Sequence, residues 1–462
     1  MKKLISIFVL AVFLLALVFW IKSDNTDPKN PVTLTIWHSF VEDMRLAFDE
    51  LINEFNGTVG AENGITVKVT SVTDTRIVSE QLVAAANNDP GAPQLPDLAV
   101  MYPRTAVTLA GKGLLVDLEQ YISKDYLDTF VPQFLEEGRL GTGKLYLMPI
   151  AKSTEVLYVN RTFFDRFSKE TGISVEALST FESIAEAAVK YYEWTDAMTP
   201  DISNDGKMFF YPERLFNHAM TAFQQLGSNI VKDKKLNLSD PVFKRVWDCY
   251  YAPAVKGGVA IYNGYGNYLA SIGDIVCTTS SSAGSTFYPS RITYSDNTRE
   301  DVVFDVLPFP VFEGGEKVTY QQGGGLCVTK SEQAKERAAA LFLKWFTSPE
   351  RNLRFCAGIG YMPVCQSAFD NILAGKSPVI SNPVVAKALM TVAGMRKNYR
   401  FFFPPVFDGF ESMQTQYAER LLQTARDGRA DYLQLLQMHD AAIAFEIVSK
   451  EAMDNYIKRF NP

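Results

Sequence analysis

The chain has 462 residues, of which 47% are hydrophobic and 13% aromatic, with a formal net charge of -7 and a pI near 5.3. It is too long for one small core, so we expect two lobes, each with an apolar centre of its own. The sequence contains no cluster of Lys and Arg, and its acidic balance therefore argues against nucleic acid as a partner.

A largely apolar run of 18 residues without a charged side chain, from Leu4 to Ile21, follows two lysines at the N-terminus. As a helix this run would be ~27 Å long, which is enough to cross a bilayer. It ends without the small-x-small pattern of a cleavage site, and no Cys follows it. Residues 1–22 are therefore interpreted as either an uncleaved membrane anchor or a cleaved signal peptide, followed by a linker at 23–31. Both alternatives place the rest of the chain outside the cytoplasm, in the periplasm or on the outer face of the membrane.

Strands and helices alternate in the next part of the chain. The patterns predict strands at 33–37, 65–69 and 98–101, and helices at 42–55 and 77–86. Such alternation is typical of an α/β lobe with a mainly parallel sheet. Ligands of these sheets bind at the carboxyl ends of the strands, so we expect binding groups there.

The character of the sequence changes from strand-rich to helix-rich after residue 150. We expect two strands, at 144–149 and 156–160, separated by a polar corner. Two helices follow, at 162–170 and from Thr180 onward, and then two further strands, at 272–278 and 302–307. The polar corner is residues 151–155. This change indicates a second lobe.

The expected division assigns 32–150 and 309–366 to lobe 1, and 151–308 and 367–462 to lobe 2. The chain would then cross between the lobes more than once. Crossings of this kind permit hinge closure.

The stretch from Tyr320 to Pro363 begins with a glycine turn and ends with a Gly-Tyr-x-Pro loop. Between them we expect a short strand at 326–328 and an amphipathic helix at 334–345. Neither a G-x-S-x-G elbow nor a Gly-Lys-Ser/Thr phosphate loop occurs in the sequence. The stretch is typical of a chain that binds a ligand, and we expect no catalysis.

Five cysteines are sparse and unevenly spaced, and none forms a CxxC pair. We expect them to be small buried apolar residues, with a Cys356–Cys365 disulfide as the alternative. The three histidines are widely separated in the sequence. The sequence therefore predicts neither a metal site nor a cofactor.

Four blocks, in this order, resemble family 1 extracellular solute-binding proteins of ABC importers: TIWHSF at 35–40, GKLYLMPIAKSTEVLYVNRTFF at 143–164, SSSAGS at 280–285, and the stretch from Tyr320 to Pro363. Within that family the chain looks most like the sugar and glycerol-3-phosphate binding members, which share the fold of maltose-binding protein. The resemblance implies a type II periplasmic-binding-protein fold, with two α/β lobes, a hinge and a ligand cleft between the lobes, preceded here by the apolar N-terminal helix.

The resemblance also implies which residues contact the ligand. These are Trp37, His38, Ser39, Tyr102, Ser153, Thr154, Ser282, Gly284, Ser285, Gly324, Gly325 and Tyr361. The chain departs from the family pattern where Phe181 replaces a tryptophan and where Pro103-Arg104 replaces a pair that is often acidic. The C-terminal arginine of glycerophosphate-binding relatives has no counterpart in register, although Arg400 lies nearby, and Asp408 is a candidate acceptor for a ligand hydroxyl.

The resemblance implies capture of a carbohydrate or glycerophosphate-type solute between the lobes and its delivery to ABC permease subunits. Two alternatives remain open: a membrane-tethered sensor ectodomain, and a carbohydrate-active enzyme with two facing carboxylates. The aromatic cluster Tyr262, Tyr265 and Tyr268 is expected either to line the wall of the second lobe or to form a surface loop.

Overall fold

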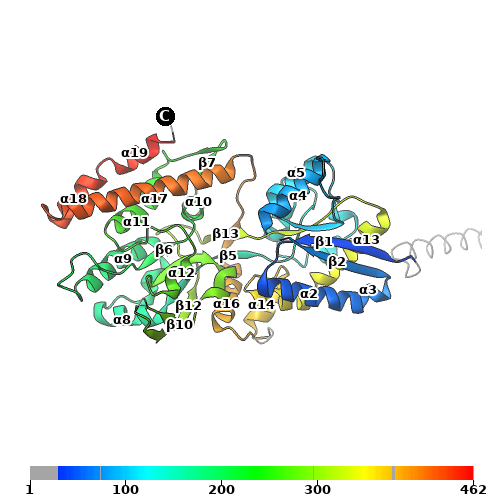
Figure 1. Cartoon of the computed structure of the whole chain (residues 1–462), viewed down its shortest axis with the longest axis horizontal. Coiled ribbons are helices and arrows are strands. Elements are labelled where there is room, and N and C mark those ends of the chain that lie inside the picture. The colour runs from blue at the N-terminus through cyan, green and yellow to red at the C-terminus, as the bar shows by residue number, and fades with distance from the viewer. Residues whose placement is uncertain (1–29, 73, 295, 377–379, 461–462) are drawn as a thin grey trace, which may run out of the picture. The chain divides into compact units, whose positions relative to one another are not determined.

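The computed structural model describes residues 30–460, apart from residues 73, 295 and 377–379 (Figure 1). The predicted anchor or signal peptide at 1–22 and most of the linker at 23–31 lie outside these residues. Within the described part of the chain, no helix has the length and apolar character needed to span a membrane.

The chain divides into two compact units. Unit 1 comprises the described residues up to Ala151, together with Gly323–Gly358 and Pro363–Ala368. Unit 2 comprises Lys152–Gln322, Ile359–Met362 and the described residues from Phe369 onward. Each unit contains a sheet covered by helices, so each is described by itself.

Unit 1 is built on a five-stranded sheet in the order β2-β1-β3-β14-β4. The strands are β1 (Val32–His38), β2 (Ile65–Ser71), β3 (Leu98–Met101), β4 (Met148–Pro149) and β14 (Gly325–Val328). β1 pairs in parallel with β2 and β3, whereas β14 runs antiparallel to β3 and β4. The three predicted parallel strands are confirmed, but the strand expected at 144–149 is reduced to its last two residues.

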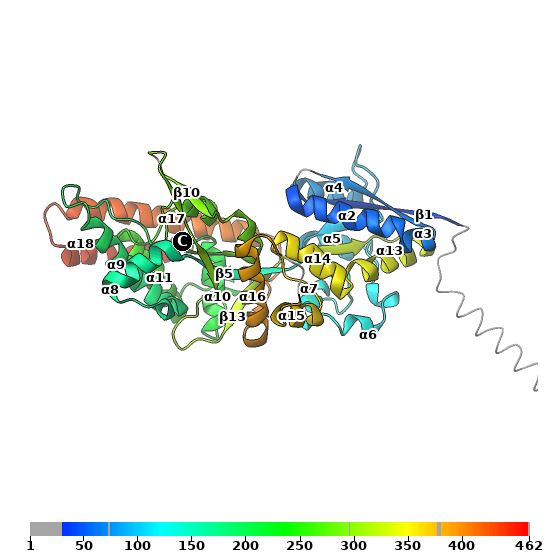
Figure 2. The same ribbon diagram turned by 90° about the horizontal axis from the view of Figure 1, so that it is seen from below.

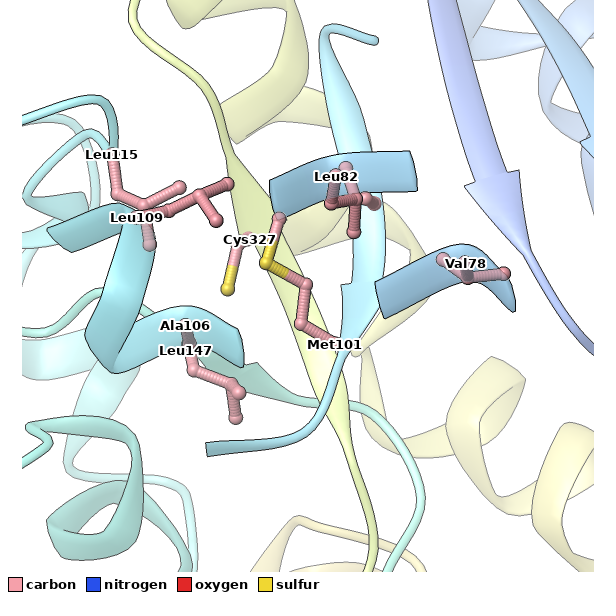
Figure 3. Packing of buried hydrophobic residues seen from close by; sticks show 9 residues of the cluster. Val78, Leu82, Met101, Ala106, Leu109, Leu115, Leu147 and Cys327 are labelled. Atoms are coloured by element: carbon pink, nitrogen blue, oxygen red, sulfur yellow. The ribbon is translucent and has the colours of Figure 1, made fainter. Parts of the chain in front are cut away.

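Helices cover both faces of this sheet. They are α2 (Glu42–Gly57), α3 (Val59–Glu62), α4 (Thr75–Asn87), α5 (Pro103–Gly111), η1 (Leu118–Gln120), α6 (Lys124–Leu127), α7 (Pro132–Gly138), α13 (Gln333–Phe346) and α14 (Pro349–Ile359). One core cluster joins Val78 and Leu82 of α4 and Leu109 of α5 to Met101 and Cys327 of the sheet (Figure 3). Apolar spacing along each helix therefore produces a buried face, as the sequence predicts.

Unit 2 contains a second sheet in the order β15-β13-β5-β9-β6, with β12 also paired to β5. Its strands are β5 (Ser153–Asn160), β6 (Phe210–Pro212), β9 (Cys277–Ser281), β12 (Phe304–Leu307), β13 (Val318–Gln322) and β15 (Arg400–Phe402). β6 and β9 are parallel, and β5 runs antiparallel to β9 and β13. Two hairpins lie outside this sheet, formed by β7 (Val231–Lys232) with β8 (Lys235–Leu236) and by β10 (Arg291–Thr293) with β11 (Arg299–Asp301).

Unit 2 is rich in helices, as expected (Figure 2). They are α8 (Arg161–Thr171), η2 (Val175–Ser179), α9 (Phe181–Asp196), α10 (Leu215–Gln225), α11 (Pro241–Val255), α12 (Gly266–Ser271), η3 (Ser282–Phe287), α16 (Pro383–Asn398), α17 (Phe410–Leu435), α18 (Ala441–Ser449) and α19 (Ala452–Lys458). α15 (Gln366–Leu373) begins in unit 1 and ends in unit 2. α17 packs on α10 and α11, and the ring of Tyr417 meets Phe216 and Tyr456 edge to face.

Three predictions about the chain path require correction. Residues 309–322 belong to unit 2 and not to the first lobe, because β13 pairs with β5 and β15. The polar corner expected at 151–155 is largely strand, since β5 begins at Ser153. The strand expected at 272–278 begins only at Cys277, because α12 and its terminal turn occupy the preceding residues.

The Cys356–Cys365 disulfide is also absent, since all five cysteines are free. The two thiols instead lie near different backbone oxygens: Cys356 Sγ is 3.7 Å from the carbonyl of Ile150, and Cys365 Sγ is 3.2 Å from that of Thr347. Burial raises the pKa of the Cys365 thiol to about 11. These cysteines are buried apolar residues, as the main prediction states.

Candidate functional site

In unit 1, the carboxyl ends of the parallel strands meet at one edge of the sheet. β1 and β3 are paired with Trp37 opposite Ala99, so the residues after each strand emerge close together. Gly325, the first residue of β14, pairs with Met101 at the same edge. The edge therefore gathers Ser39, Tyr102 and Gly324, three of the predicted ligand contacts.

His38 lies at this edge but is fully buried. Its ring stacks on Phe40 and meets Phe48 edge to face, and its Nδ1 accepts the backbone N–H of Phe40 over 3.0 Å. Burial lowers the pKa of His38 to about 4, so the imidazole is neutral at physiological pH. His38 thus fixes the turn after β1 through Nδ1, and its contact with a ligand stays a prediction.

The two predicted glycines are explained by backbone packing. A Cβ on Gly324 would lie 2.6 Å from the carbonyl oxygen of Met101, and one on Gly325 would clash with Met148 and Leu147. Gly325 is buried within β14, so it is corrected from a ligand contact to a packing position. Trp37 is half-buried and packs against the core cluster of unit 1.

Ser39 and Tyr102 remain as accessible candidates on unit 1. The Ser39 hydroxyl lies 2.8 Å from that of Thr75. Tyr102 is 44% exposed and caps the N-terminus of α5, with Pro103 as the first helical residue. A half-exposed ring of this kind can stack on a flat apolar surface of a ligand.

In unit 2, one edge of the sheet gathers the ends of several strands. β6 and β9 end there, and the antiparallel strand β5 begins there at Ser153. β13 also ends there, since Gln322 pairs with Ser153. The start of β5 and the ends of β6, β9 and β13 therefore lie at the same edge of the sheet.

The predicted Ser-Thr pair at the start of β5 divides into two roles. The Thr154 hydroxyl lies 2.9 Å from that of Thr319 and donates to the Tyr320 carbonyl over 2.8 Å. Its backbone N–H donates to the Ser282 hydroxyl over 3.3 Å. Thr154 and Ser282 thus join β5, β13 and η3 to one another, and the structure assigns both a structural role. Ser153 remains a candidate at the edge of the sheet.

The 3-10 helix η3 lies against the Gly-Tyr-x-Pro loop. A Cβ on Gly360 would clash with the Ser285 hydroxyl, and Met362 forms a β-bridge with Lys152. The structure therefore brings the half-buried Tyr361 and the fully buried Ser285 to the edge where β5 begins. A Cβ on Gly284 would meet only Ser280 Oγ, at an ordinary contact distance of 3.7 Å.

Arg400 does not join this edge. It is the first residue of β15, which pairs in parallel with β13 so that Arg400 lies opposite Val318. Both residues are at the other end of the strand pair, and the Arg400 guanidinium lies 3.5 Å from Gln224 Oε1. Arg400, the nearby candidate of the sequence analysis, therefore lies away from the other candidates, whereas the exposed Asp408 follows the carboxyl end of β15.

Sequence reasoning missed a polar cluster at the carboxyl end of β6. Glu213 follows this strand and accepts hydrogen bonds from the Gly266 backbone N–H over 2.8 Å and from the Ser280 hydroxyl over 2.9 Å. Arg214 Nε lies 3.8 Å from Glu213 Oε1, and its guanidinium sits over the ring of Tyr265 at 5.7 Å. The cluster fixes a carboxylate, a guanidinium and an exposed aromatic ring side by side.

A second missed pair lies beside this cluster. Glu155, on β5, is buried and accepts a hydrogen bond from Asn217 Nδ2 of α10 over 3.0 Å. Burial, with a smaller contribution from the nearby Glu213 carboxylate, raises the pKa of the Glu155 carboxyl to about 7. A carboxyl of this kind, inside a sheet and next to a cavity, is an uncommon feature.

A cavity of about 320 Å³ within unit 2 lies beside these residues. Its wall includes Glu213, Arg214 and Asn217 after β6, Tyr262 and Asn263 before α12, and Glu411 and Gln414 of α17. The volume is at the lower end of the range for small-molecule sites. Among the described residues, no group of three or more His, Cys, Asp or Glu could hold a metal ion.

The sequence carried signals for these residues. In FFYPERLFNHAM, an aromatic stretch ends in Glu213-Arg214 immediately before a helix, which is where a parallel strand delivers binding groups. Glu155 stood in an apolar strand, STEVLYVN, but was grouped with the polar corner. The part played by α17 depends on a fold-back of distant sequence that no local pattern reveals.

Comparison with known proteins identifies the class of this fold. Residues 50–390 match the family described as bacterial extracellular solute-binding protein. The match covers well over half of the chain, and the chain belongs to this family. The predicted family, and the expectation of a binding protein instead of an enzyme, are confirmed. The family is extracellular, in keeping with the predicted location.

The individual relatives share a quarter or less of their residues with this chain. The maltotriose-binding protein of Pyrococcus abyssi (strain GE5 / Orsay) is 25% identical over 365 residues, which are 75% of this chain and 70% of that protein. The cyclic alpha-maltosyl-1,6-maltose binding protein of Arthrobacter globiformis has a TM-score of 0.67 at 16% identity, covering 93% of this chain and 100% of that one. UgpB of Mycobacterium tuberculosis, in complex with glycerophosphocholine, has a TM-score of 0.63 at 18% identity, with coverage of 93% and 100%. The predicted two-lobe α/β fold is confirmed by these likenesses.

Proposed function

We propose that the chain captures a carbohydrate and delivers it to the permease of an ABC importer. The observation that carries this proposal is the cavity at the carboxyl edge of the unit 2 sheet, where Glu213, Arg214 and Asn217 meet Tyr262. Carboxylates, amides and guanidinium groups suit the paired donors and acceptors of sugar hydroxyls. Exposed aromatic rings beside them offer a flat apolar surface to a sugar ring.

The charge of the cavity favours a carbohydrate over a glycerophosphate derivative. Glu213, Glu411 and Glu419 line it, against a single Arg214. An anionic phosphate would meet three carboxylates for one guanidinium, which is unfavourable in a partly desolvated site. The separation of Arg400 from this edge removes a second cation that would offset that charge.

Unit 1 carries candidate contacts of its own. The exposed ring of Tyr102 and the hydroxyl of Ser39 stand at the carboxyl edge of its sheet. We propose that they contact the same solute as the unit 2 cavity. The family of the chain supports a carbohydrate as the solute, since its Pyrococcus abyssi relative is a maltotriose-binding protein.

Titration calorimetry of the full chain with maltotriose and with glycerophosphocholine tests the proposal. We expect maltotriose to bind, Arg214→Ala to weaken binding at least ~10-fold, and Arg400→Ala to leave it unchanged, because the two arginines lie at opposite edges of one sheet. If glycerophosphocholine binds and maltotriose does not, the solute is a glycerophosphodiester and not a carbohydrate. If a panel of oligosaccharides and glycerophosphodiesters gives no binding, the proposed function is wrong.

A further inference from the structure

A buried carboxyl and a buried carboxamide meet beside the cavity of unit 2. Glu155 is 3% exposed and Asn217 is 8% exposed. Asn217 Nδ2 donates to Glu155 Oε1 over 3.0 Å. Within the part of the chain that the structure describes, this is the one side-chain hydrogen bond that Asn217 makes.

The carboxylate determines which way the amide of Asn217 points. An ionised carboxylate can only accept hydrogen bonds, so the NH2 group of Asn217 must face Glu155. The carbonyl Oδ1 is then directed away from Glu155. Because Asn217 also lines the 320 Å³ cavity, this oxygen is available to the cavity as an acceptor.

We propose that Asn217 accepts a hydrogen bond from a hydroxyl of the bound carbohydrate, and that Glu155 is the positioning residue that orients the Asn217 amide for this contact. The inference rests on the proposed function, which it deepens by naming a residue pair that selects among solutes. A solute without a hydroxyl at this place would leave the Asn217 oxygen unpaired in the closed site, which is costly.

Protonation of Glu155 would reverse the arrangement. A neutral carboxylic acid has an O–H donor, which can pair with Asn217 Oδ1 once the amide turns over. The cavity would then meet the NH2 group in place of the oxygen. The affinity for a solute whose hydroxyl donates at this place should therefore fall as Glu155 takes up its proton.

The surroundings of Glu155 place this change near neutral pH. Burial raises its pKa to about 7, the Asn217 hydrogen bond lowers it, the Glu213 carboxylate raises it and the Arg214 guanidinium lowers it. Its partner on β9, Ser281, is uncharged, as is Gln322 of β13 at the same edge. Glu213 and Arg214 are thus the charged groups whose fields act on this carboxyl, and they act in opposite directions.

The test measures the affinity for maltotriose from pH 5.5 to 8.5 with the full chain, its Glu155→Gln variant and the control Glu193→Gln, which removes an exposed carboxylate from α9. We expect the wild type and the control to bind about 10-fold more weakly at pH 6 than at pH 8, because only about a tenth of Glu155 remains ionised at pH 6. Glu155→Gln should bind with an affinity that changes less than ~2-fold over this range, since its amide does not titrate. Equal pH profiles for the wild type and Glu155→Gln would overturn the inference.

A second measurement separates failure of this inference from failure of the proposed function. If neither maltotriose nor glycerophosphocholine binds at any pH, the carbohydrate proposal fails. Urea unfolding at pH 5 and pH 8 then decides, without any ligand, whether Glu155 titrates between these pH values. The raised pKa predicts that the wild type loses stability relative to Glu155→Gln as the pH rises between these values. A stability difference that is the same at both pH values overturns the inference.

Discussion

The carboxyl edges of the two sheets use their polar residues in different ways. In unit 1, His38 is buried in an aromatic cluster, and Gly325 packs against the Met148 carbonyl and the Leu147 side chain. These two residues at the edge therefore serve packing. In unit 2, Glu213, Arg214 and Asn217 surround a cavity with charged and amide groups. The comparison teaches that the same place in two α/β units can hold mainly packing residues in one unit and polar, hydrogen-bonding residues in the other.

The contrast gives unit 2 the larger share of solute selectivity. Hydrogen-bonding groups that are held in place by other buried groups distinguish solutes better than mobile ones, because a mismatch leaves them unpaired. Unit 1 contributes an exposed ring and a hydroxyl, Tyr102 and Ser39, which add contact area with less discrimination. The predictions below test this division, from the largest expected effect to the smallest.

The largest effect should follow from filling the close approach at Gly325. Gly325→Val would drive its side chain into Met148 and Leu147, and we expect a loss of about 3 kcal/mol in the free energy of unfolding. The matched control in unit 2 is Gly284→Ala, whose Cβ would find its nearest neighbour, Ser280 Oγ, at 3.7 Å. Urea unfolding of both variants measures the difference. An equal loss in the two would show that packing is not concentrated at the edge of unit 1.

Two buried groups, His38 of unit 1 and Glu155 of unit 2, should change the stability with pH in opposite directions. Burial lowers the pKa of His38 to about 4, so the unfolded chain binds more protons and stability falls as the pH drops from about 6.5 to about 4. The raised pKa of Glu155 has the reverse effect, with stability falling as the pH rises from about 4.5 to about 7. His38→Asn should reduce the first slope, to which His218 of unit 2 also contributes because burial lowers its pKa to about 4. Glu155→Gln should remove the second slope, and each change should be at most about 1.4 kcal/mol per pH unit.

Thermal or urea unfolding across pH 4 to 8 checks these slopes. The control is the exposed Glu193→Gln, which should retain both. If His38→Asn keeps the acid-side slope of the wild type, the assignment of that slope to the buried imidazole is wrong.

Thr154 and Ser153 offer a comparison within one strand. Thr154→Val removes hydrogen bonds to Thr319 and Tyr320 inside the sheet, and we expect it to cost about 1–3 kcal/mol of stability while the solute affinity changes less than ~2-fold. Ser153→Ala should do the opposite, with a small effect on stability and a ~5-fold loss of affinity. Unfolding and calorimetry on the same two variants decide. A large affinity loss in Thr154→Val would return Thr154 to the ligand contacts.

The smallest effect concerns unit 1. Tyr102→Ala removes a ring that is 44% exposed, so stability should change by less than ~0.5 kcal/mol. Affinity for maltotriose should fall by about 5-fold, the value of one stacking contact of roughly 1 kcal/mol. Tyr102→Phe serves as the control and should bind as the wild type does. A loss as large as that of Arg214→Ala would contradict the division of selectivity between the units.

Much of the fold could be predicted because it depends on local periodicity. The strands at 33–37, 65–69 and 98–101 and the helix begun by Thr180 follow from apolar spacing and capping. The path of 309–322 could not be predicted, because β13 pairs with β5 and β15, which are distant in the sequence. Pairing over such distances leaves no mark on the local pattern.

The candidate site was less predictable than the fold. Topology brings Ser39, Tyr102 and Ser153 to the ends of their strands, as the sequence indicates, and their contact with a ligand stays a prediction. Sequence does not show that the His38 ring lies inside an aromatic cluster or that the Thr154 hydroxyl is bonded within the sheet. The Glu155–Asn217 pair was missed for the same reason, since its significance comes from burial.

The most direct test of the central claim is hydrogen-deuterium exchange of the full chain with and without saturating maltotriose. The account predicts slower exchange in the segments that line the cavity, 213–217 and 262–266, and after β3 at Tyr102, because bound solute excludes water from these backbone groups. Segments at the far edge of the unit 2 sheet, around Arg400, should exchange as before. Binding of maltotriose without protection at 213–217 and 262–266 would contradict the account.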